Sequence, residues 1–464
     1  MNQKPKPRAR ANCGKIVSLL SLWVVITWGG CDVGSVSAQG LTFTTNTYMV
    51  GSRPESNIAV DLNGDGKVDL ACANSRDNSI SVLTNNGSGG FALASGLNVG
   101  AYPNSLTAAD VNGDGKMDLI CANTGANTIS VLTNDGYGNF TLASLASIGG
   151  FTYSITGADI NGDGNVDLIC ANEYAGTLQV LTNDGGGNFT IASTLTAGGY
   201  PSSVVTADVN GDGKMDLICA NAMNSVSIYT NDGSGGFVLS STPETDWDSY
   251  PAIASDINGD GKVDIIAASW ISVSLSVLTN DGAGNFSSEC IVDVLDQDTR
   301  FGCPDGVAAA DMNGDGKVDL ICANWCAGLI QVFTNDGSGG FTLASAIGIN
   351  SSPASVTTAD VNGDGKMDVI SVNGDNTLTV LVNTSIFPPP TVIPSLAMNF
   401  QGQSLRIAWP SVNSGWSLQQ SADLIIPNWS PSGYGGYPIS DDGTNKSLTI
   451  PISRGNMFFR LLHP

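Results

Sequence analysis

The chain alternates short apolar runs with turns rich in glycine, asparagine and aspartate, and the stretch 105–144 shows the pattern most clearly. The run 117–122 is almost continuously apolar, as in a strand covered on both faces, whereas 128–133 alternates Ile129 and Val131 with polar residues. An Asn-Asp-Gly turn then leads into a segment that begins at Phe140. With a short strand at 105–110, the pattern predicts four antiparallel strands.

This unit is repeated along the chain. A nine-residue segment of the form DxNGDGxxD occurs seven times, at 61–69, 110–118, 159–167, 208–216, 256–264, 311–319 and 360–368. The copies begin 49, 49, 49, 48, 55 and 49 residues apart, a period that suits a four-stranded propeller blade. The sequence therefore predicts an all-β fold, a seven-bladed β-propeller.

The two ends of the repeat array predict how the ring closes. The last copy stops after its third strand and lacks the Phe-led fourth strand, whereas Phe43 stands 18 residues before Asp61, close to the 19 found in most other copies. We expect residues 41–50 to be the fourth strand of the last blade, which removes the exposed edges of an open array. The predicted propeller spans 41–384.

A second, smaller unit is expected beyond the ring. Residues 385–396 form a Pro-rich, extended linker, and 397–464 alternate apolar and polar residues around Leu405, Ile407 and Trp409. We expect a small C-terminal β module, serving either as a sorting or surface-attachment module or as a cap.

Charge and histidine content exclude several classes of function. The 464 residues carry a formal charge of −24, so nucleic acid is not an expected partner. The only histidine, His463, lies next to the C-terminus, which excludes zinc chemistry and His-dependent triads in the body of the protein.

The N-terminus has the form of an export signal. Basic residues precede an apolar run from 16 to 28 and a small-residue site that ends at Ala38, so 1–38 is predicted to be a signal peptide. Lipoprotein processing before Cys31 is the weaker alternative. No later apolar run is long enough to span a membrane, so the mature chain is expected to be secreted or associated with the cell surface.

The repeated segments, called Asp loops below, have the ligand pattern of a hard cation. Side-chain oxygens stand at the first, third, fifth and ninth places and a carbonyl at the seventh, while the glycine at the sixth, Gly66 in the first loop, permits a sharp turn. Up to seven Ca²⁺ ions, mainly structural, are predicted, which would change the formal charge from −24 to −10. The predicted ligands are Asp61, Asn63, Asp65, Lys67, Asp69, Asp110, Asn112, Asp114, Lys116, Asp118, Asp159, Asn161, Asp163, Asn165, Asp167, Asp208, Asn210, Asp212, Lys214, Asp216, Asp256, Asn258, Asp260, Lys262, Asp264, Asp311, Asn313, Asp315, Lys317, Asp319, Asp360, Asn362, Asp364, Lys366 and Asp368.

These loops, with the Phe-led segments and Tyr-Pro elements such as 102–103 and 200–201, resemble the FG-GAP/VCBS repeats of integrin α-subunit propellers and their bacterial relatives. The resemblance covers about 41–384 and implies a calcium-stabilised propeller used in adhesion or recognition. Two features depart from integrins: all seven copies keep the full acidic loop, and no Arg-Gly-Asp sequence occurs.

The partner is expected on the face opposite the Asp loops, because the segments that vary between repeats lie there. Trp247, Trp270 and Trp325 fall in one sector of that face and are candidate ligand-binding residues. The alternative is that they pack the insertion near residue 300 onto the ring.

The cysteines form two groups. Five share one second-strand place in different blades and are predicted to be buried free thiols: Cys72, Cys121, Cys170, Cys219 and Cys322. Of the others, Cys290 and Cys303 are the preferred disulfide pair, with Cys326 as a competitor.

The expected function is recognition of a glycan or protein partner by a monomeric propeller, without catalysis. A calcium-dependent polysaccharide lyase is the enzyme alternative, but few basic residues stand outside the loops. A structural role in a surface assembly is the third possibility.

Overall fold

The computed structural model describes residues 40–246, 249–294, 302–349 and 351–387, and the strands between 397 and 462. The predicted signal peptide, Cys31, Trp247 and residues 388–396 of the predicted linker lie outside the described residues. The chain divides after Ile386 into two compact units.

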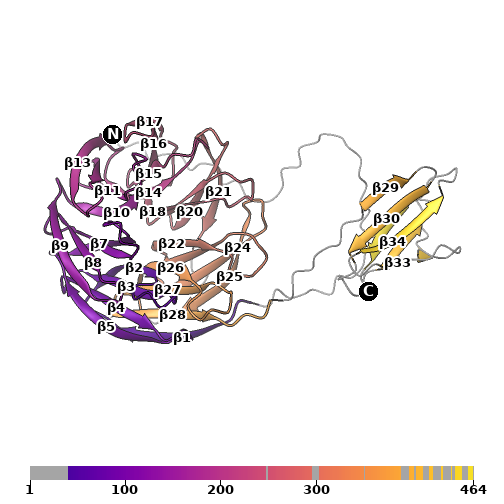
Figure 1. Cartoon of the computed structure of the whole chain (residues 1–464), viewed down its shortest axis with the longest axis horizontal. Helices are drawn as coiled ribbons and strands as arrows, with labels where there is room; N and C mark the ends of the chain where they lie inside the picture. The colour runs from indigo at the N-terminus through magenta and orange to yellow at the C-terminus, as the bar shows by residue number, and fades with distance from the viewer. Residues whose placement is uncertain are drawn as a thin grey trace, which may run out of the picture. The chain divides into compact units, whose positions relative to one another are not determined.

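The first unit is a ring of seven four-stranded antiparallel sheets (Figure 1). Blade one contains β2–β5, at Pro54–Val60, Asp69–Asn74, Ser79–Asn85 and Phe91–Asn98. Blade two contains β6–β9, at Pro103–Ala109, Asp118–Asn123, Thr128–Asn134 and Phe140–Ser147. Blade three contains β10–β13, at Thr152–Ala158, Asp167–Asn172, Thr177–Asn183 and Phe189–Thr196. Blade four contains β14–β17, at Pro201–Ala207, Asp216–Asn221, Ser225–Asn231 and Phe237–Ser241.

The remaining blades follow the same order. Blade five contains β18–β21, at Ser249–Ser255, Asp264–Ser269, Ser274–Asn280 and Phe286–Asp293. Blade six contains β22–β25, at Pro304–Ala310, Asp319–Asn324, Leu329–Asn335 and Phe341–Gly348. Blade seven contains β26–β28, at Pro353–Ala359, Asp368–Asn373 and Thr377–Asn383, and takes β1, Phe43–Met49, as its fourth strand. The predicted four-stranded unit and blade number are confirmed.

The N-terminal strand closes the ring as predicted. β1 runs antiparallel to β28, from Phe43 opposite Asn383 to Met49 opposite Thr377. Side chains of β1 also reach the core, since Tyr48 packs edge to face on Phe91 of blade one. Both ends of the repeat array therefore meet within one sheet.

The core consists of seven apolar clusters, one at each interface between neighbouring blades. The second strand of every blade is buried along its whole length, because its two faces contact different neighbours. Between blades one and two, for example, Leu62 and Val82 pack with Leu119 and Leu132. The continuous apolar run seen in each repeat is explained by this double burial.

A buried asparagine at the end of each third strand links each blade to the one before it. In blade two the Nδ2 of Asn134 donates to the carbonyl of Leu62 in blade one at 2.8 Å and to Met117 at 2.9 Å. We call these residues the bridging asparagines: Asn85, Asn134, Asn183, Asn231, Asn280, Asn335 and Asn383. Because Asn85 donates to Val361 of blade seven, the set of inter-blade hydrogen bonds closes around the ring.

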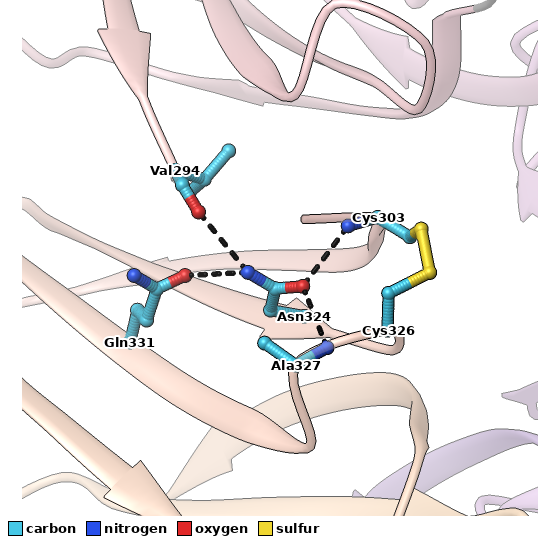
Figure 2. The surroundings of a disulfide bond; sticks show 6 residues. All are labelled: Val294, Cys303, Asn324, Cys326, Ala327 and Gln331. Carbon is cyan, nitrogen blue, oxygen red and sulfur yellow. Dashed lines mark hydrogen bonds between the residues drawn. A yellow bond between two sulfur atoms is a disulfide. The ribbon is translucent and has the colours of Figure 1, made fainter. Parts of the chain in front are cut away.

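The five predicted free thiols are free and buried. The preferred disulfide was wrong: Cys303 pairs with Cys326, with Cα atoms 5.2 Å apart (Figure 2). Cys303 precedes β22 and Cys326 follows β23, and the antiparallel register of these strands brings them together, as the 2.9 Å bond from Trp325 N to Cys303 O shows. Cys290 lies in β21, where its backbone is opposite Val277 in the sheet of blade five. Its nearness to Cys303 in sequence was therefore misleading.

The second unit is a small β module, as predicted. One sheet contains β29, β30, β34 and β33, at Ala397–Gln401, Ser404–Pro410, Asn445–Pro451 and Ser440–Asp441. The other contains β32, β31 and β35, at Ser430–Pro431, Ser417–Ser421 and Phe458–Leu462. Ile407 and Leu448 lie opposite each other in the first sheet and are buried. Among the described residues, no helix is long and apolar enough to cross a membrane.

Ring closure gives a direct test. A variant beginning at Gly51 lacks β1, and we expect its unfolding free energy to fall by at least about 3 kcal/mol, because apolar contacts of side chains such as Phe43 and Tyr48 are lost. The exposed edge of β28 should also promote self-association. Denaturant unfolding and size-exclusion chromatography measure both effects. A chain beginning at Gly40 is the control, and equal stability of the two would contradict the closure.

Candidate functional site

The ring has two ends. The first strand of each blade, called the inner strand below, runs from one end to the other. Each Asp loop follows the end of an inner strand, as residues 61–68 follow β2, and the turns between third and fourth strands lie at the same end. We call this the Asp-loop face. The inner strands begin at the opposite face, where the turns between second and third strands also lie. The two faces differ in how much the seven repeats vary.

Each Asp loop folds around its first aspartate. In blade one, Asp61 accepts hydrogen bonds from the N–H of Gly64 and of Gly66, both at 2.8 Å. Asn63 Oδ1 accepts from Asp65 N at 2.9 Å, and Asp65 in turn accepts from Lys67 N at 3.0 Å. Gly64 and Gly66 have φ of 74° and 79°, which an L side chain rarely adopts, so the turn depends on glycine at both places.

The last aspartate of each loop, which we call the closing aspartate, is fully buried. Asp69 accepts from Leu62 N at 3.1 Å through one oxygen and from Asn85 N at 2.8 Å through the other. It thus fixes both the start of the loop and the bridging asparagine. The other closing aspartates make the same two bonds: Asp118, Asp167, Asp216, Asp264, Asp319 and Asp368.

Burial raises the pKa of every closing aspartate, and the first and fifth residues of the same loop raise it further by repulsion. The pKa reaches about 6 for Asp319 and for Asp368. The structure therefore brings three carboxylates of each loop within electrostatic reach of one another, which is the condition that a bound cation relieves.

The donor set of the loops fits calcium in kind. All the predicted ligands are oxygens, and they fall within one hydrogen-bonded turn. A lysine also partly offsets the charge in six loops, as Lys67 pairs with Asp65 at 3.3 Å, whereas blade three has Asn165 at that place. Among the described residues, no three His, Cys, Asp or Glu side chains are grouped as a metal site on their own. Calcium in these loops stays a prediction.

The tryptophans predicted to bind a ligand have different surroundings. Trp247 lies outside the described residues, and Trp270 is 43% exposed. Trp325 is partly buried against the apolar cluster shared by blades seven and one, and its ring approaches Gly374 of blade seven. Trp325 therefore contributes to packing between blades, and ligand binding by the tryptophans stays a prediction.

Sequence reasoning missed the cavity at the centre of the opposite face. This axial cavity, of about 210 Å³, is lined by the first strands of all seven blades, which lie nearest the axis of the ring in Figure 1. The residue six places before each loop contributes a different group from almost every blade: Glu55, Asn104, Tyr153, Ser202, Tyr250, Asp305 and Ala354. Variation at one fixed place in the repeat was the signal that could have located it.

Serine hydroxyls form the next level of the axial cavity. Ser56 Oγ accepts from Leu106 N of the next blade at 3.2 Å, and Ser105, Ser154 and Ser203 make the equivalent bond at 3.2 to 3.4 Å. Each of these hydroxyls uses a lone pair to join neighbouring inner strands. Pro251 and Gly306 replace serine in blades five and six, so the series is interrupted there.

The mouth of the cavity combines acidic and aromatic groups. Glu55 pairs with Arg53 at 2.7 Å and accepts from Ser75 Oγ at 3.1 Å. The rings of Tyr153 and Tyr250 meet edge to face, with centroids 5.7 Å apart.

Two further carboxylates lie near this mouth. Tyr250 Oη donates to Glu173 at 3.4 Å. Burial, together with repulsion from Glu55, raises the pKa of Asp305 to about 7, although Arg53 acts to lower it. Asp305 is therefore a partly buried carboxyl group of the cavity with a raised pKa.

Comparison with known proteins agrees with this architecture. The family model described as FG-GAP-like repeat matches residues 61–121, 110–170, 159–219, 208–267, 256–322 and 311–371. A search of curated proteins found no match.

Two solved structures of one protein, at low sequence identity, share the fold. BBS1N in complex with ARL6DN, soaked with lead, gives a TM-score of 0.54 at 12% identity, over 75% of this chain and 99% of that chain. The mercury-soaked form gives 0.53 at 11%, over 74% and 96%. An Agrocybe aegerita lectin that recognises non-reducing terminal N-acetylglucosamine gives 0.46 at 18%, over 75% and 96%.

The raised pKa of Asp305 predicts that its ionised form destabilises the folded protein. Because the folded pKa of about 7 lies above the ordinary aspartate value of 3.8, stability is lost as pH rises between these values. Asp305→Asn should therefore melt like the wild type at pH 4 and higher than the wild type at pH 8, by up to about 4 kcal/mol in unfolding free energy. Thermal denaturation at both pH values measures this. If the difference in stability between Asp305→Asn and the wild type is the same at pH 4 and pH 8, the raised pKa of Asp305 is contradicted.

Proposed function

The chain belongs to the FG-GAP-like repeat family, and we propose that it is an exported, calcium-stabilised recognition protein that binds a glycan or protein partner in adhesion. The observation that carries this proposal is the axial cavity, to which seven blades contribute six different kinds of side chain at one place in the repeat. A scaffold that needed only packing could use the same residue seven times. The variation instead suits a surface that fits an asymmetric partner.

The composition of the axial cavity favours binding over lyase chemistry. Among the residues that the structure describes, its lining includes no lysine, arginine or histidine, and burial raises the pKa of Tyr153, a tyrosine that could otherwise act as a base. A lyase base needs a lowered pKa to remove a proton near neutral pH. Arg53 at the mouth is paired with Glu55.

Calcium in this proposal stabilises the Asp-loop face. The side chains of the first, third, fifth and closing residues would hold the ion, with the carbonyl of the seventh, as in Asp61, Asn63, Asp65, Asp69 and Lys67. A bound cation offsets the repulsion among the three carboxylates, so binding to the folded state raises its stability.

Chelation should therefore lower the melting temperature strongly. We expect purified protein in excess EGTA to melt at least about 10 °C below protein in 1 mM CaCl₂, with recovery on adding calcium back. Magnesium at the same concentration is the control for ionic strength. A melting temperature that excess EGTA leaves unchanged would contradict the calcium proposal.

The location of the partner site can be tested on the same protein. A glycan array and a surface-protein array, each probed with calcium, should give binding that Tyr153→Ala reduces at least tenfold. Tyr137→Ala is the matched control, because Tyr137 is 83% exposed in a turn at the Asp-loop face. Binding lost in the control variant but kept in Tyr153→Ala would place the partner on the wrong face for this proposal.

A further inference from the structure

We infer that the axial cavity binds a sugar residue that carries a protonated amine, that is, a 2-amino-2-deoxyhexose with a free ammonium group. This inference rests on the proposed recognition function and adds the chemical class of the ligand. It uses three independent properties of the cavity: an unpaired, partly buried carboxylate, two tyrosine rings at the mouth, and a set of serine hydroxyl groups.

The carboxylates at the mouth of the cavity favour a cationic ligand. Glu55 and Asp305 both line the cavity, and among the described residues the guanidinium near them, that of Arg53, is already engaged by Glu55 at 2.7 Å. Asp305 has no hydrogen-bond or ion-pair partner among the described residues, although it is partly buried and lines the cavity. An unpaired carboxylate in such a place is costly, and a ligand ammonium group would supply the missing partner.

The aromatic groups at the same place favour an organic ammonium over a bare metal ion. Tyr153 and Tyr250 come from blades three and five, meet edge to face, and line the cavity together with Glu55 and Asp305. A cationic group over an aromatic face is attracted to the ring, and the apolar face of a sugar also packs well on it. An amino sugar can make both of these interactions.

The serine hydroxyls that line the cavity indicate that the remainder of the ligand, apart from its ammonium group, is polar. Ser56, Ser105 and Ser154 each accept a backbone N–H from the next blade, and a hydroxyl that accepts one hydrogen bond can still donate another. Such donors suit the hydroxyl oxygens of a sugar, whereas the alkyl stem of a lysine side chain would leave them unmatched. The amino sugar is therefore favoured over a lysine-containing peptide.

The size of the cavity limits how much of the ligand enters. At about 210 Å³ it is smaller than the roughly 300–1,000 Å³ of pockets that hold drug-sized ligands. One terminal sugar residue fits this space better than an internal stretch of polysaccharide. The ligand is accordingly a chain end or a monosaccharide.

Isothermal titration calorimetry of the calcium-loaded full chain tests the inference, with glucosamine, glucose, N-acetylglucosamine and Nα-acetyl-lysine amide as probes. Glucosamine should bind at least tenfold more tightly than the other three, and Asp305→Asn should weaken it at least tenfold. Affinity should also fall between pH 7.0 and pH 5.5, because Asp305 gains a proton there. Tyr137→Ala should bind like the wild type.

Several results would overturn the inference. Equal binding of glucose or N-acetylglucosamine removes the role of the ammonium group, and tighter binding of the lysine derivative replaces the sugar by a peptide. If array partners bind and are lost in Tyr153→Ala while glucosamine does not bind, the recognition function stands and the amino-sugar assignment fails. If glucosamine binds but Asp305→Asn does not weaken it, the binding site lies elsewhere.

Discussion

The closing aspartate is the group on which the rest of the ring depends. A fully buried carboxylate is unfavourable unless its oxygens are satisfied, and Asp118 meets this condition by accepting N–H groups from Val111 in its own loop and from Asn134 at the end of the third strand. Asn134 then reaches the carbonyl of Leu62 in the preceding blade. One side chain thus connects the Asp loop, the sheet and the neighbouring blade, and the arrangement recurs in all seven blades.

This shared requirement explains why the two faces diverge. On the Asp-loop face, loop, hairpin and blade contact are joined through the closing aspartate, so the seven copies stay nearly identical. At the start of the inner strands the backbone pairing needs no particular side chain, and residues as different as Glu55, Tyr153 and Ala354 occupy one place. The cavity can therefore carry recognition chemistry without weakening the blade.

The repeats predicted the fold because period and pattern are local properties. Four strands, seven blades and the closing role of residues 41–50 followed from spacing and from one missing strand. The disulfide and the axial cavity depend on which distant residues meet. Cys303 and Cys326 are joined by strand register, and the cavity gathers residues from Glu55 to Asp305 that are distant in sequence. Trp325 illustrates the same limit, since exposure and packing look alike in a sequence.

A double-mutant cycle between Asp118 and Asn134 tests the central claim most directly. If the carboxylate positions Asn134 for its bond to Leu62, the loss of unfolding free energy caused by Asn134→Ala should be smaller in an Asp118→Asn background, by about 1–2 kcal/mol. Asn280, which bonds to the closing aspartate of blade five and to Val209 of blade four, supplies the control, and Asn280→Ala should add independently to Asp118→Asn. Additive costs for Asp118 and Asn134, within about 0.5 kcal/mol, would contradict the account.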